Sequence, residues 1–303
     1  MSDRKPPRGE SLYRGPAAPR DKRERERERD RSARPASPPA RERAPLRERL
    51  DAAQSESHSA REQRVYGLNA CLALFAQRPQ DIRKVWLLES RIPKLKGVLA
   101  FCVKHRLGYT IVEDLDLEKL SGSAHHEGVC FSAMPREEQS LSAWLRELPR
   151  GPAIALWLDG VGNPHNLGAI LRSAAHFGAA GVLLPKHSEL AVSGAAARVA
   201  EGGAEQVPMV RLGRSDNAIA QLKSAGFELA ATVVRGGRSL YSLQLPERLV
   251  LVMGAEQIGV GADMSDAAAL KLGIPGSGRV ESLNVASATA VCLGEWLRQR
   301  DAG

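Results

Sequence analysis

Residues 249–261 read LVLVMGAEQIGVG, in which five apolar residues run directly into a glycine-rich loop. An unbroken apolar run of this length is typical of a strand that is covered on both faces, as in a parallel sheet flanked by helices. In such sheets, ligands bind beyond the carboxyl ends of the strands. We therefore expect a functional site at the loop that begins at Gly254.

The sequence around this strand alternates between two patterns over residues 153–303. We expect strands over 154–158, 181–184, 207–210, 227–234, 249–253 and 270–274, and helices over 166–177, 195–204, 217–225 and 284–300. Strands that alternate with helices in this way predict an α/β fold with a parallel sheet covered by helices.

A smaller α/β unit precedes this segment, at residues 63–134. Here we expect strands over 82–88, 109–112 and 128–133, and helices over 67–77, 93–105 and 115–120. Residues 135–152, between the two units, are polar and flanked by prolines, with one short helix over 141–148. Such a composition is typical of a domain boundary, and we interpret this stretch as a linker.

The first 62 residues differ in composition from the rest. The chain carries a formal charge of +8, and residues 1–60 hold 16 of its 43 Lys and Arg residues and 8 of its 18 prolines. This stretch has too few apolar side chains to offset the chain entropy lost on folding, so we expect a disordered Arg/Pro-rich tail. Two interpretations stay open: an arm that binds RNA phosphates, or a solvated tail whose alternating acidic residues cancel much of its field.

Several classes of protein are disfavoured. No apolar stretch approaches the roughly 18 residues of a transmembrane helix, and the N-terminus lacks the apolar core of a secretory signal. The four cysteines are far apart and form no CxxC pair, which disfavours a zinc ribbon or a disulfide scaffold. His125 and His126 have no Cys or acidic partner at metal-ligand spacing, so we expect no metal site. Reduced thiols are typical of a cytoplasmic protein, the location that we expect.

The loop over residues 159–172 reads DGVGNPHNLGAILR and follows an expected strand. Asn166 stands at a natural helix N-cap, and Gly168 leaves room for another backbone to approach closely. Arg172 lies six residues beyond Asn166, on a different face of the expected helix. Taken alone, these residues have an ordinary explanation as a helix cap and a surface salt bridge.

Two further loops, 254–261 and 275–284, are also rich in glycine. In the first of these, the carboxylate of Glu256 disfavours a phosphate cradle and favours a neutral or cationic ligand. This loop is not a Walker loop, because the Gly-Lys-Ser/Thr ending is absent, and it is not a GxGxxG loop, because Glu256 stands where that pattern needs a glycine. In the second, Ser282 and Asn284 can cap the last helix. Each loop is a weak signal by itself.

Together, the three loops resemble the three motifs of the SpoU (TrmH-like) family of RNA ribose 2′-O-methyltransferases, in the SPOUT superfamily. The matching residues are Asn163-Pro164, Asn166, Gly168, Ile170, Arg172, Ala174 and Phe177-Gly178 in the first motif, Met253-Gly254, Glu256 and Gly259 in the second, and Ile274-Pro275, Gly278 and Ser282-Leu283-Asn284-Val285 in the third. Residues 66–133 are also similar to the family's N-terminal substrate-binding domain, which is L30e/L7Ae-like. The tail and this arrangement are most similar to the YfiF-like branch of tRNA/rRNA methyltransferases.

The resemblance implies a fold, a cofactor and partners. Residues 153–303 would form a trefoil-knotted α/β methyltransferase domain, an exception to the rule that chains do not thread their own loops. S-adenosylmethionine would be the methyl donor, bound around Gly254, Ile274, Leu283 and Asn284. The substrate would be rRNA or tRNA, and the chain would act as a homodimer through the knotted domain, without a membrane or a metal.

The resemblance also implies three catalytic residues. Arg172 would bind the phosphate next to the target ribose and stabilise the developing alkoxide, because an ordinary arginine does not lose its proton in water. Asn166 would orient Arg172 or the ribose. Glu256 would position the loop or Asn166, and its charge would suit a cationic sulfonium.

The third motif departs from the family pattern at two places. Gly276 stands where the family often has Met, and Ala286 precedes Ser287 where a hydroxyl is expected first. This displaces the hydroxyl by one position, about 100° around a helix. A non-catalytic RNA-binding or ribosome-assembly protein on the same scaffold is therefore an alternative. Another nucleotide-binding α/β enzyme is disfavoured by the missing Walker and GxGxxG signatures.

Overall fold

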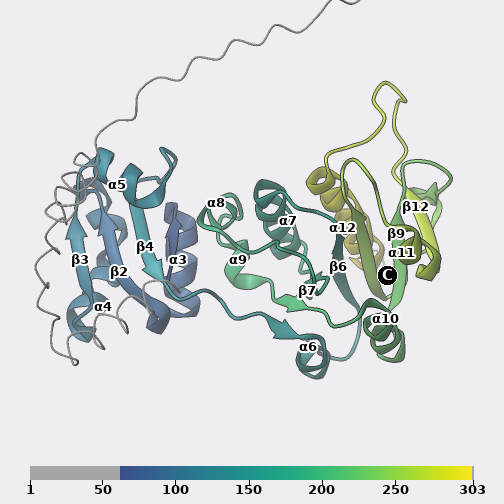
Figure 1. Cartoon of the computed structure of the whole chain (residues 1–303), viewed down its shortest axis with the longest axis horizontal. Coiled ribbons are helices and arrows are strands. Elements are labelled where there is room, and N and C mark those ends of the chain that lie inside the picture. Colours follow the sequence, from purple (N-terminus) through teal and green to yellow (C-terminus); the bar gives the residue numbers. More distant parts are fainter. Residues whose placement is uncertain (1–61, 302–303) are drawn as a thin grey trace, which may run out of the picture. The chain divides into compact units, whose positions relative to one another are not determined.

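Figure 1 shows the computed structural model of the 303-residue chain, which describes residues 62–301. The tail expected over residues 1–62 lies outside the described residues, apart from Glu62. The strands within the described residues form two separate sheets, one of four strands and one of eight.

The four-stranded sheet has the order β1-β4-β2-β3, with β4 antiparallel to β1 and β2, and with β3 parallel to β2. Its strands are β1 (Gln63–Tyr66), β2 (Ile82–Leu87), β3 (Gly108–Ile111) and β4 (Val129–Ala133), and its helices are α3 (Leu68–Gln77), α4 (Lys96–His105) and α5 (Asp114–Ser121). Two short 3₁₀ turns, Pro79–Asp81 and Glu89–Lys94, flank β2. We refer to residues 62–134 as the small domain.

The core of the small domain lies between this sheet and α3 and α4. Leu74 of α3 and Cys102 of α4 pack in one cluster with Val85 and Phe131 of the sheet, and all four are fully buried. The strand β1 was not expected from the sequence, because QRVY carries only one aliphatic residue.

The eight-stranded sheet has the order β10-β12-β9-β11-β6-β7-β8-β5, and all of its strand pairs are parallel. Its strands are β5 (Gln139–Ser140), β6 (Ala153–Asp159), β7 (Gly181–Leu184), β8 (Met209–Arg211), β9 (Glu228–Thr232), β10 (Arg238–Ser239), β11 (Arg248–Gly254) and β12 (Leu270–Gly273). Its helices are α6 (Leu141–Glu147), α7 (Pro164–His176), α8 (Gly194–Val199), α9 (Gly203–Gln206), α10 (Ser215–Ser224), α11 (Ala262–Ala267) and α12 (Val285–Asp301), with one 3₁₀ turn at Leu240–Ser242. We refer to residues 139–301 as the large domain.

Helices cover both faces of the large sheet, as the sequence predicts. One cluster joins the sheet to α7 and α12, which lie side by side (Figure 1). The other cluster joins the opposite face to α6, α10 and α11. Alternate residues of β11 belong to different clusters, with Leu251 in the first and Val250 and Val252 in the second. The apolar run of β11 therefore reflects burial on both faces.

In the segment over residues 135–152, which we expected to be a linker with one helix, residues 139–147 form a strand and a helix of the large domain. It adds β5 to the edge of the sheet beside β8, and α6 follows directly. Trp144 of α6 is buried, stacks on Phe227 with 5.8 Å between the ring centroids, and donates a hydrogen bond from Nε1 to the Ala180 carbonyl at 2.9 Å. One buried tryptophan thus anchors a stretch whose average composition is polar.

The single helix expected over residues 195–204 is divided into α8 and α9. Glu201 and Gly202 between them have φ values of 51° and 94°, which a right-handed helix does not allow. Short elements with weak patterns, β10 and α11, were also not expected. Within residues 62–301, no helix is long and apolar enough to cross a membrane.

Gln299 attaches the end of α12 to the rest of the large domain, and the buried Glu295 on the same helix holds it in place. Glu295 is 7% exposed and accepts hydrogen bonds from Arg298 Nε at 2.8 Å and from Gln299 Nε2 at 2.8 Å. Gln299 also binds the segment before β11, donating to Leu243 O and accepting from Leu245 N, each at 2.9 Å. The hydrogen bonds from Arg298 and then Gln299 lower the pKa of Glu295 from 4.5 to about 2.

This network predicts a pH-dependent contribution of Glu295 to stability. Because its folded-state pKa is depressed, the contribution is present above the unfolded value of 4.5 and is lost as the pH falls towards 2. Glu295→Gln should lower the free energy of unfolding by about 1 kcal/mol at pH 7, a modest value because the Arg298 guanidinium is exposed to solvent. Urea unfolding at pH 7 and pH 3 should show that the difference shrinks in acid. The exposed Glu228→Gln serves as control, and an equal loss at both pH values would contradict the assignment.

Candidate functional site

The strands β6 and β11 bring two of the three predicted loops together. They pair in parallel over seven residues, so that Asp159 at the end of β6 lies opposite Gly254 at the end of β11. The loops that follow, 160–163 and 255–261, therefore begin at the same edge of the sheet.

The three predicted motifs meet in one hydrogen-bonded cluster. Asn166 donates from Nδ2 to Glu256 Oε1 at 3.0 Å. Asn284 Nδ2 donates to the same Glu256 oxygen at 2.7 Å, and lies 3.0 Å from Asn166 Oδ1. These residues come from α7, from the loop after β11 and from the residue that precedes α12. The structure thus gathers three predicted site residues that are far apart in the sequence, and we call them the Asn-Glu-Asn cluster.

The cap of α7 differs from our expectation. Asn163, not Asn166, is the N-cap, and its Oδ1 accepts a hydrogen bond from His165 N at 2.8 Å. The proline at residue 164 explains the shift, since proline is favoured at the first helical position and disfavours helical geometry in the residue before it. Asn166 lies in the first turn of the helix, where its side chain is available to Glu256.

Asn284 has the capping role that the sequence predicts. Its Oδ1 accepts a hydrogen bond from Ala286 N at 2.9 Å, directly before α12. The two ends of its amide therefore have different roles, because the oxygen caps the helix while the nitrogen joins the Asn-Glu-Asn cluster.

The loop after β11 closes on itself immediately. Ala255 N donates to Gly259 O at 3.1 Å and Gly259 N donates to Ala255 O at 2.7 Å. A Cβ on Gly254 would overlap the backbone of Gly259 and Val260, so only glycine fits there. Asp159 Oδ2 accepts from Gly261 N at 2.7 Å and ties the end of the loop to β6. Sequence reasoning gave Asp159 no role, although an acidic residue at a strand end beside a glycine-rich loop is a usable signal.

A small cavity of about 60 Å³ opens beside the Asn-Glu-Asn cluster. It is lined by the two loops, by the first turn of α7 and by the start of α12, through Gly160, Val161, Gly162, Asn163, Asn166, Ala255, Glu256 and Val285. The predicted loops also carry exposed apolar side chains, with Ile258 at 85%, Val280 at 72% and Leu283 at 47% exposure. Ile274 is half-buried against the core of the large domain.

Arg172 is not part of this cluster. It is exposed, and within residues 62–301 its side chain makes no hydrogen bond or ion pair. Six helical residues correspond to about 600°, which turns Arg172 away from Asn166 on α7. The expectation that Asn166 orients Arg172 within one chain therefore has no contact to support it.

Gly168 of α7 does permit a close backbone approach, and the partner is α8. A Cβ at Gly168 would lie 2.6 Å from Ala196 O and 2.7 Å from Val199 Cβ.

In the third motif, Ala286 is 7% exposed, while Ser287, one position further, is exposed. The displaced hydroxyl therefore points away from the buried side of α12.

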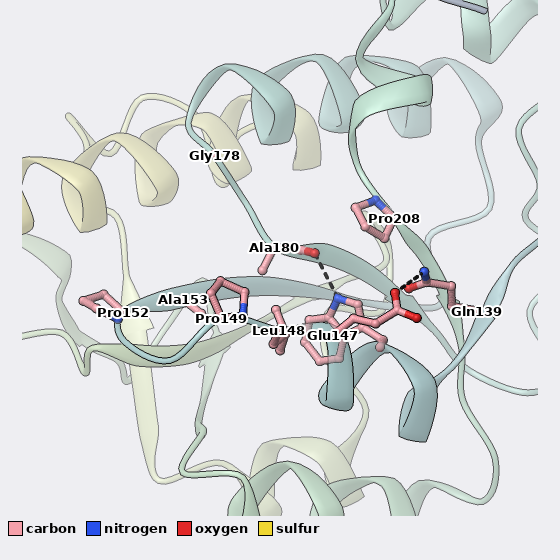
Figure 2. A pocket seen from close by; sticks show the side chains of 10 residues that line it. Gln139, Glu147, Leu148, Pro149, Pro152, Ala153, Gly178, Ala180 and Pro208 are labelled. Atoms are coloured by element: carbon pink, nitrogen blue, oxygen red, sulfur yellow. Dashed lines mark hydrogen bonds between the residues drawn. The ribbon is translucent and has the colours of Figure 1, made fainter. Parts of the chain in front are cut away.

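A larger cavity, of about 360 Å³, lies at the other end of the strands from the Asn-Glu-Asn cluster (Figure 2). Ala153 begins β6 there, and Gly178 and Ala180 precede β7, so this cavity is at the amino ends of the strands. Figure 2 shows Gln139 donating a hydrogen bond to Glu147, at 3.0 Å. None of the residues predicted for the site lines this cavity.

Comparison with protein families confirms the resemblance carried by the three loops. The model of the SpoU rRNA Methylase family matches residues 153–294. A second model, for RNA 2′-O ribose methyltransferase substrate binding, matches residues 64–139. Together the two matches extend over both sheets.

Individual relatives agree with these matches. The tRNA/rRNA methyltransferase YfiF of Escherichia coli O157:H7, itself named uncharacterized, is 40% identical over 243 residues, which are 80% of this chain and 70% of that protein. The 23S rRNA (guanosine-2′-O-)-methyltransferase RlmB of Pseudomonas putida is 32% identical over 241 residues, 78% of this chain and 97% of that protein.

Solved structures share the fold. The SpoU methyltransferase AviRb of Streptomyces viridochromogenes, in complex with AdoMet, superimposes with a TM-score of 0.68 at 20% identity, over 81% of this chain and 93% of that one. An AdoMet-bound rRNA methyltransferase of Sinorhizobium meliloti gives 0.67 at 24% identity, over 81% and 90%. The family matches, the relatives and the shared fold lead to one conclusion: this chain belongs to the SpoU rRNA methylase family.

Proposed function

We propose that this chain transfers a methyl group from S-adenosylmethionine to a ribose 2′-hydroxyl of rRNA or tRNA. The observation that carries the proposal is the Asn-Glu-Asn cluster, in which the three segments that resemble the family motifs meet at one edge of the sheet. In this proposal residues 63–134 are the substrate-binding domain and residues 153–303 the methyltransferase domain, and the reaction takes place in the cytoplasm.

The residues at this edge fit the methyl donor. The turn at Gly254 is too tight for a Cβ, which fixes the backbone of the loop at the strand end, and Leu283 offers exposed apolar surface for a planar base. Gly254, Ile274, Leu283 and Asn284 would hold S-adenosylmethionine. When bound, it supplies a methyl group on a cationic sulfonium, a charge that the carboxylate of Glu256 complements.

The protein contributes mainly position and electrostatics. Glu256 accepts two amide hydrogen bonds on one oxygen, which fixes Asn166 and Asn284 relative to each other. Arg172 has an exposed guanidinium with no partner among the described residues, as a group that binds the phosphate of an incoming RNA requires. Since arginine keeps its proton, it stabilises the developing alkoxide as a cation.

The separation of Arg172 from the Asn-Glu-Asn cluster supports a homodimer through the methyltransferase domain. A second copy would complete each site if it brought its own Arg172 to the cluster of the first. The last helix, α12, has the surface for such an interface, because Ala288, Val291 and Leu297 are apolar and only half-buried. In this proposal the segment from β12 to α12 also forms a trefoil knot.

The alternative, a non-catalytic RNA-binding or ribosome-assembly protein, is favoured by one observation. Ala286 occupies the buried position where the family pattern has a hydroxyl, and Ser287 points elsewhere. The activity of the purified chain separates the two functions.

Replacing Arg172 tests the enzymatic role directly. Calorimetry should show that the full chain binds S-adenosylmethionine, and labelled methyl should pass to total bacterial RNA. Arg172→Ala should keep the donor affinity and lower transfer by about a hundredfold, as for the loss of one transition-state donor. The exposed Arg146→Ala serves as control. Donor binding without transfer to any RNA favours the non-catalytic alternative, and no binding at millimolar donor overturns the proposal.

Two variants of Glu256 separate its geometry from its charge. Glu256→Gln keeps an oxygen that can accept both amides, so the cluster should persist while the affinity for the cationic donor falls about tenfold, or about 1.4 kcal/mol. Glu256→Ala removes the acceptor as well and should reduce the transfer rate further. Calorimetry and single-turnover transfer provide the measurements, with Glu247→Gln at the other end of β11 as control. Equal donor affinity in Glu256→Gln and the parent would exclude an electrostatic role.

Sedimentation tests the dimer. At micromolar concentration the mass should be near 65 kDa, twice the 32.7 kDa of one chain. Val291→Asp places a charge on the half-buried surface of α12 and should give monomers that keep their circular dichroism and lose methyl transfer. A parent mass near one chain would refute the homodimer.

A further inference from the structure

The small domain is attached to the large domain by a buried ion pair. Arg78, at the end of α3, is 8% exposed, and it donates from Nε to Glu205 Oε2 at 2.8 Å and from an Nη atom to Oε1 at 2.9 Å. Glu205 belongs to α9, and its side chain is 8% exposed. The described parts of both domains belong to a single compact unit. A bidentate arginine–carboxylate pair of this kind fixes the relative orientation of the two side chains as well as their distance.

The charges around this pair are balanced. Arg78 also contacts Asp81 at 3.3 Å and the Met134 carbonyl. Arg136 donates to Ala204 O at 2.7 Å and to Val207 O at 2.8 Å, which satisfies two carbonyls at the end of α9. Burial tends to lower the pKa of Arg78, but the hydrogen bonds and charges of Glu205 and Asp81 outweigh it and raise the pKa.

Glycines let the two domains approach closely around the pair. A Cβ on Gly202 would lie 3.0 Å from Ala73 Cβ of α3, and one on Gly67 would lie 2.9 Å from Arg198 Cγ of α8. Ala197 of α8 is buried in the core cluster of the small domain. The contact is therefore continuous packing and not a flexible tether.

The same two short helices contact the functional helix α7 on their other side. A Cβ on Gly203 would lie 2.6 Å from Leu171 O and 3.1 Å from Arg172 Cα. Gly168 of α7 packs in the same way on α8. Thus α8 and α9 are a rigid spacer between α3 of the small domain and the segment that carries Asn166 and Arg172.

We propose that the Arg78–Glu205 pair holds the small domain in one orientation on this spacer, and thereby determines which ribose of a bound RNA reaches the proposed methyl-transfer site. The inference rests on the proposed function, since it takes the small domain as the part that binds RNA. Arg78 and Glu205 are positioning residues, and neither contacts the site. Their buried charges make the arrangement sensitive, because removing Arg78 leaves the Glu205 carboxylate without its ion-pair partner, and removing Glu205 leaves Arg78 paired with Asp81 alone.

The orientation of the domains can be measured without any activity. All four native cysteines are buried, so spin labels can be attached at Val103→Cys on α4 and Ser224→Cys on α10, which are exposed positions in different domains. The parent full-length chain should give one narrow distance distribution by pulsed electron resonance. Glu205→Gln and Arg78→Met should broaden it. Arg78→Lys should broaden the distribution less, because an ammonium keeps the positive charge but cannot make the bidentate contact.

The same variants should alter methyl transfer in a specific way. With total RNA from bacteria that lack this gene, Glu205→Gln should raise KM for RNA about tenfold and distribute methyl over additional riboses, with S-adenosylmethionine affinity unchanged. The control is Asp116→Asn, which breaks the exposed Lys119–Asp116 pair of the small domain, with 3.6 Å between the charged atoms. It should change neither the distance distribution nor the methylation pattern.

The outcomes separate this inference from the proposed function. A broad distribution in the parent overturns the inference, as does an unchanged distribution in both Glu205→Gln and Arg78→Met. Altered distances with an unchanged methylation pattern overturn the role in choosing the ribose. If the parent transfers no methyl but gives a narrow distribution that broadens in the variants, the proposed function fails and the rigid attachment stands.

Discussion

The parallel pairing of β6 with β11 is the constraint on which the site depends. Register fixes Asp159 opposite Gly254, so the loops after the two strands share one origin. Asp159 then accepts a hydrogen bond from the Gly261 backbone, and Glu256 lies where it accepts hydrogen bonds from Asn166 and Asn284. A shift of one residue would exchange the two buried faces of a strand and separate these partners. The hydrophobic core thus sets the geometry of a polar cluster that is itself open to solvent.

Much of the fold was predictable because the central strands are buried on both faces. Continuous apolar runs such as residues 249–253 have few alternative structures, and the predicted and observed strands agree within one or two residues. Where the pattern is short or polar, local conformation and single contacts decide. Glu201 and Gly202 divide a predicted helix by positive φ values, and Trp144 anchors a stretch that average composition marks as a linker.

Part of the candidate site was also predictable, because its residues follow the ends of strands that the sequence predicts. Asn166, Glu256 and Asn284 were identified from motifs, and their meeting follows from the order of the parallel strands. The cap at Asn163 was missed because two asparagines stand within four residues, and only the position of the proline distinguishes them. Helical periodicity predicts that Arg172 faces away from Asn166. It does not predict what Arg172 binds, and within the described residues its side chain has no partner.

Arg78, which is buried, and Arg172, which is exposed, show that the net charge of a chain says little about the role of one residue. Most of the +8 charge lies in the first 60 residues, outside the described structure, while the described body is nearly neutral. Within that body, Arg78 is enclosed by carboxylates and fixes orientation, whereas Arg172 has no partner and is available to a phosphate. Both lie against the same spacer, α8 and α9, on opposite sides. The spacer packs through Gly202 on α3 and through Gly203 on α7, so it links the ion pair that we propose fixes the small domain to the helix that carries Arg172.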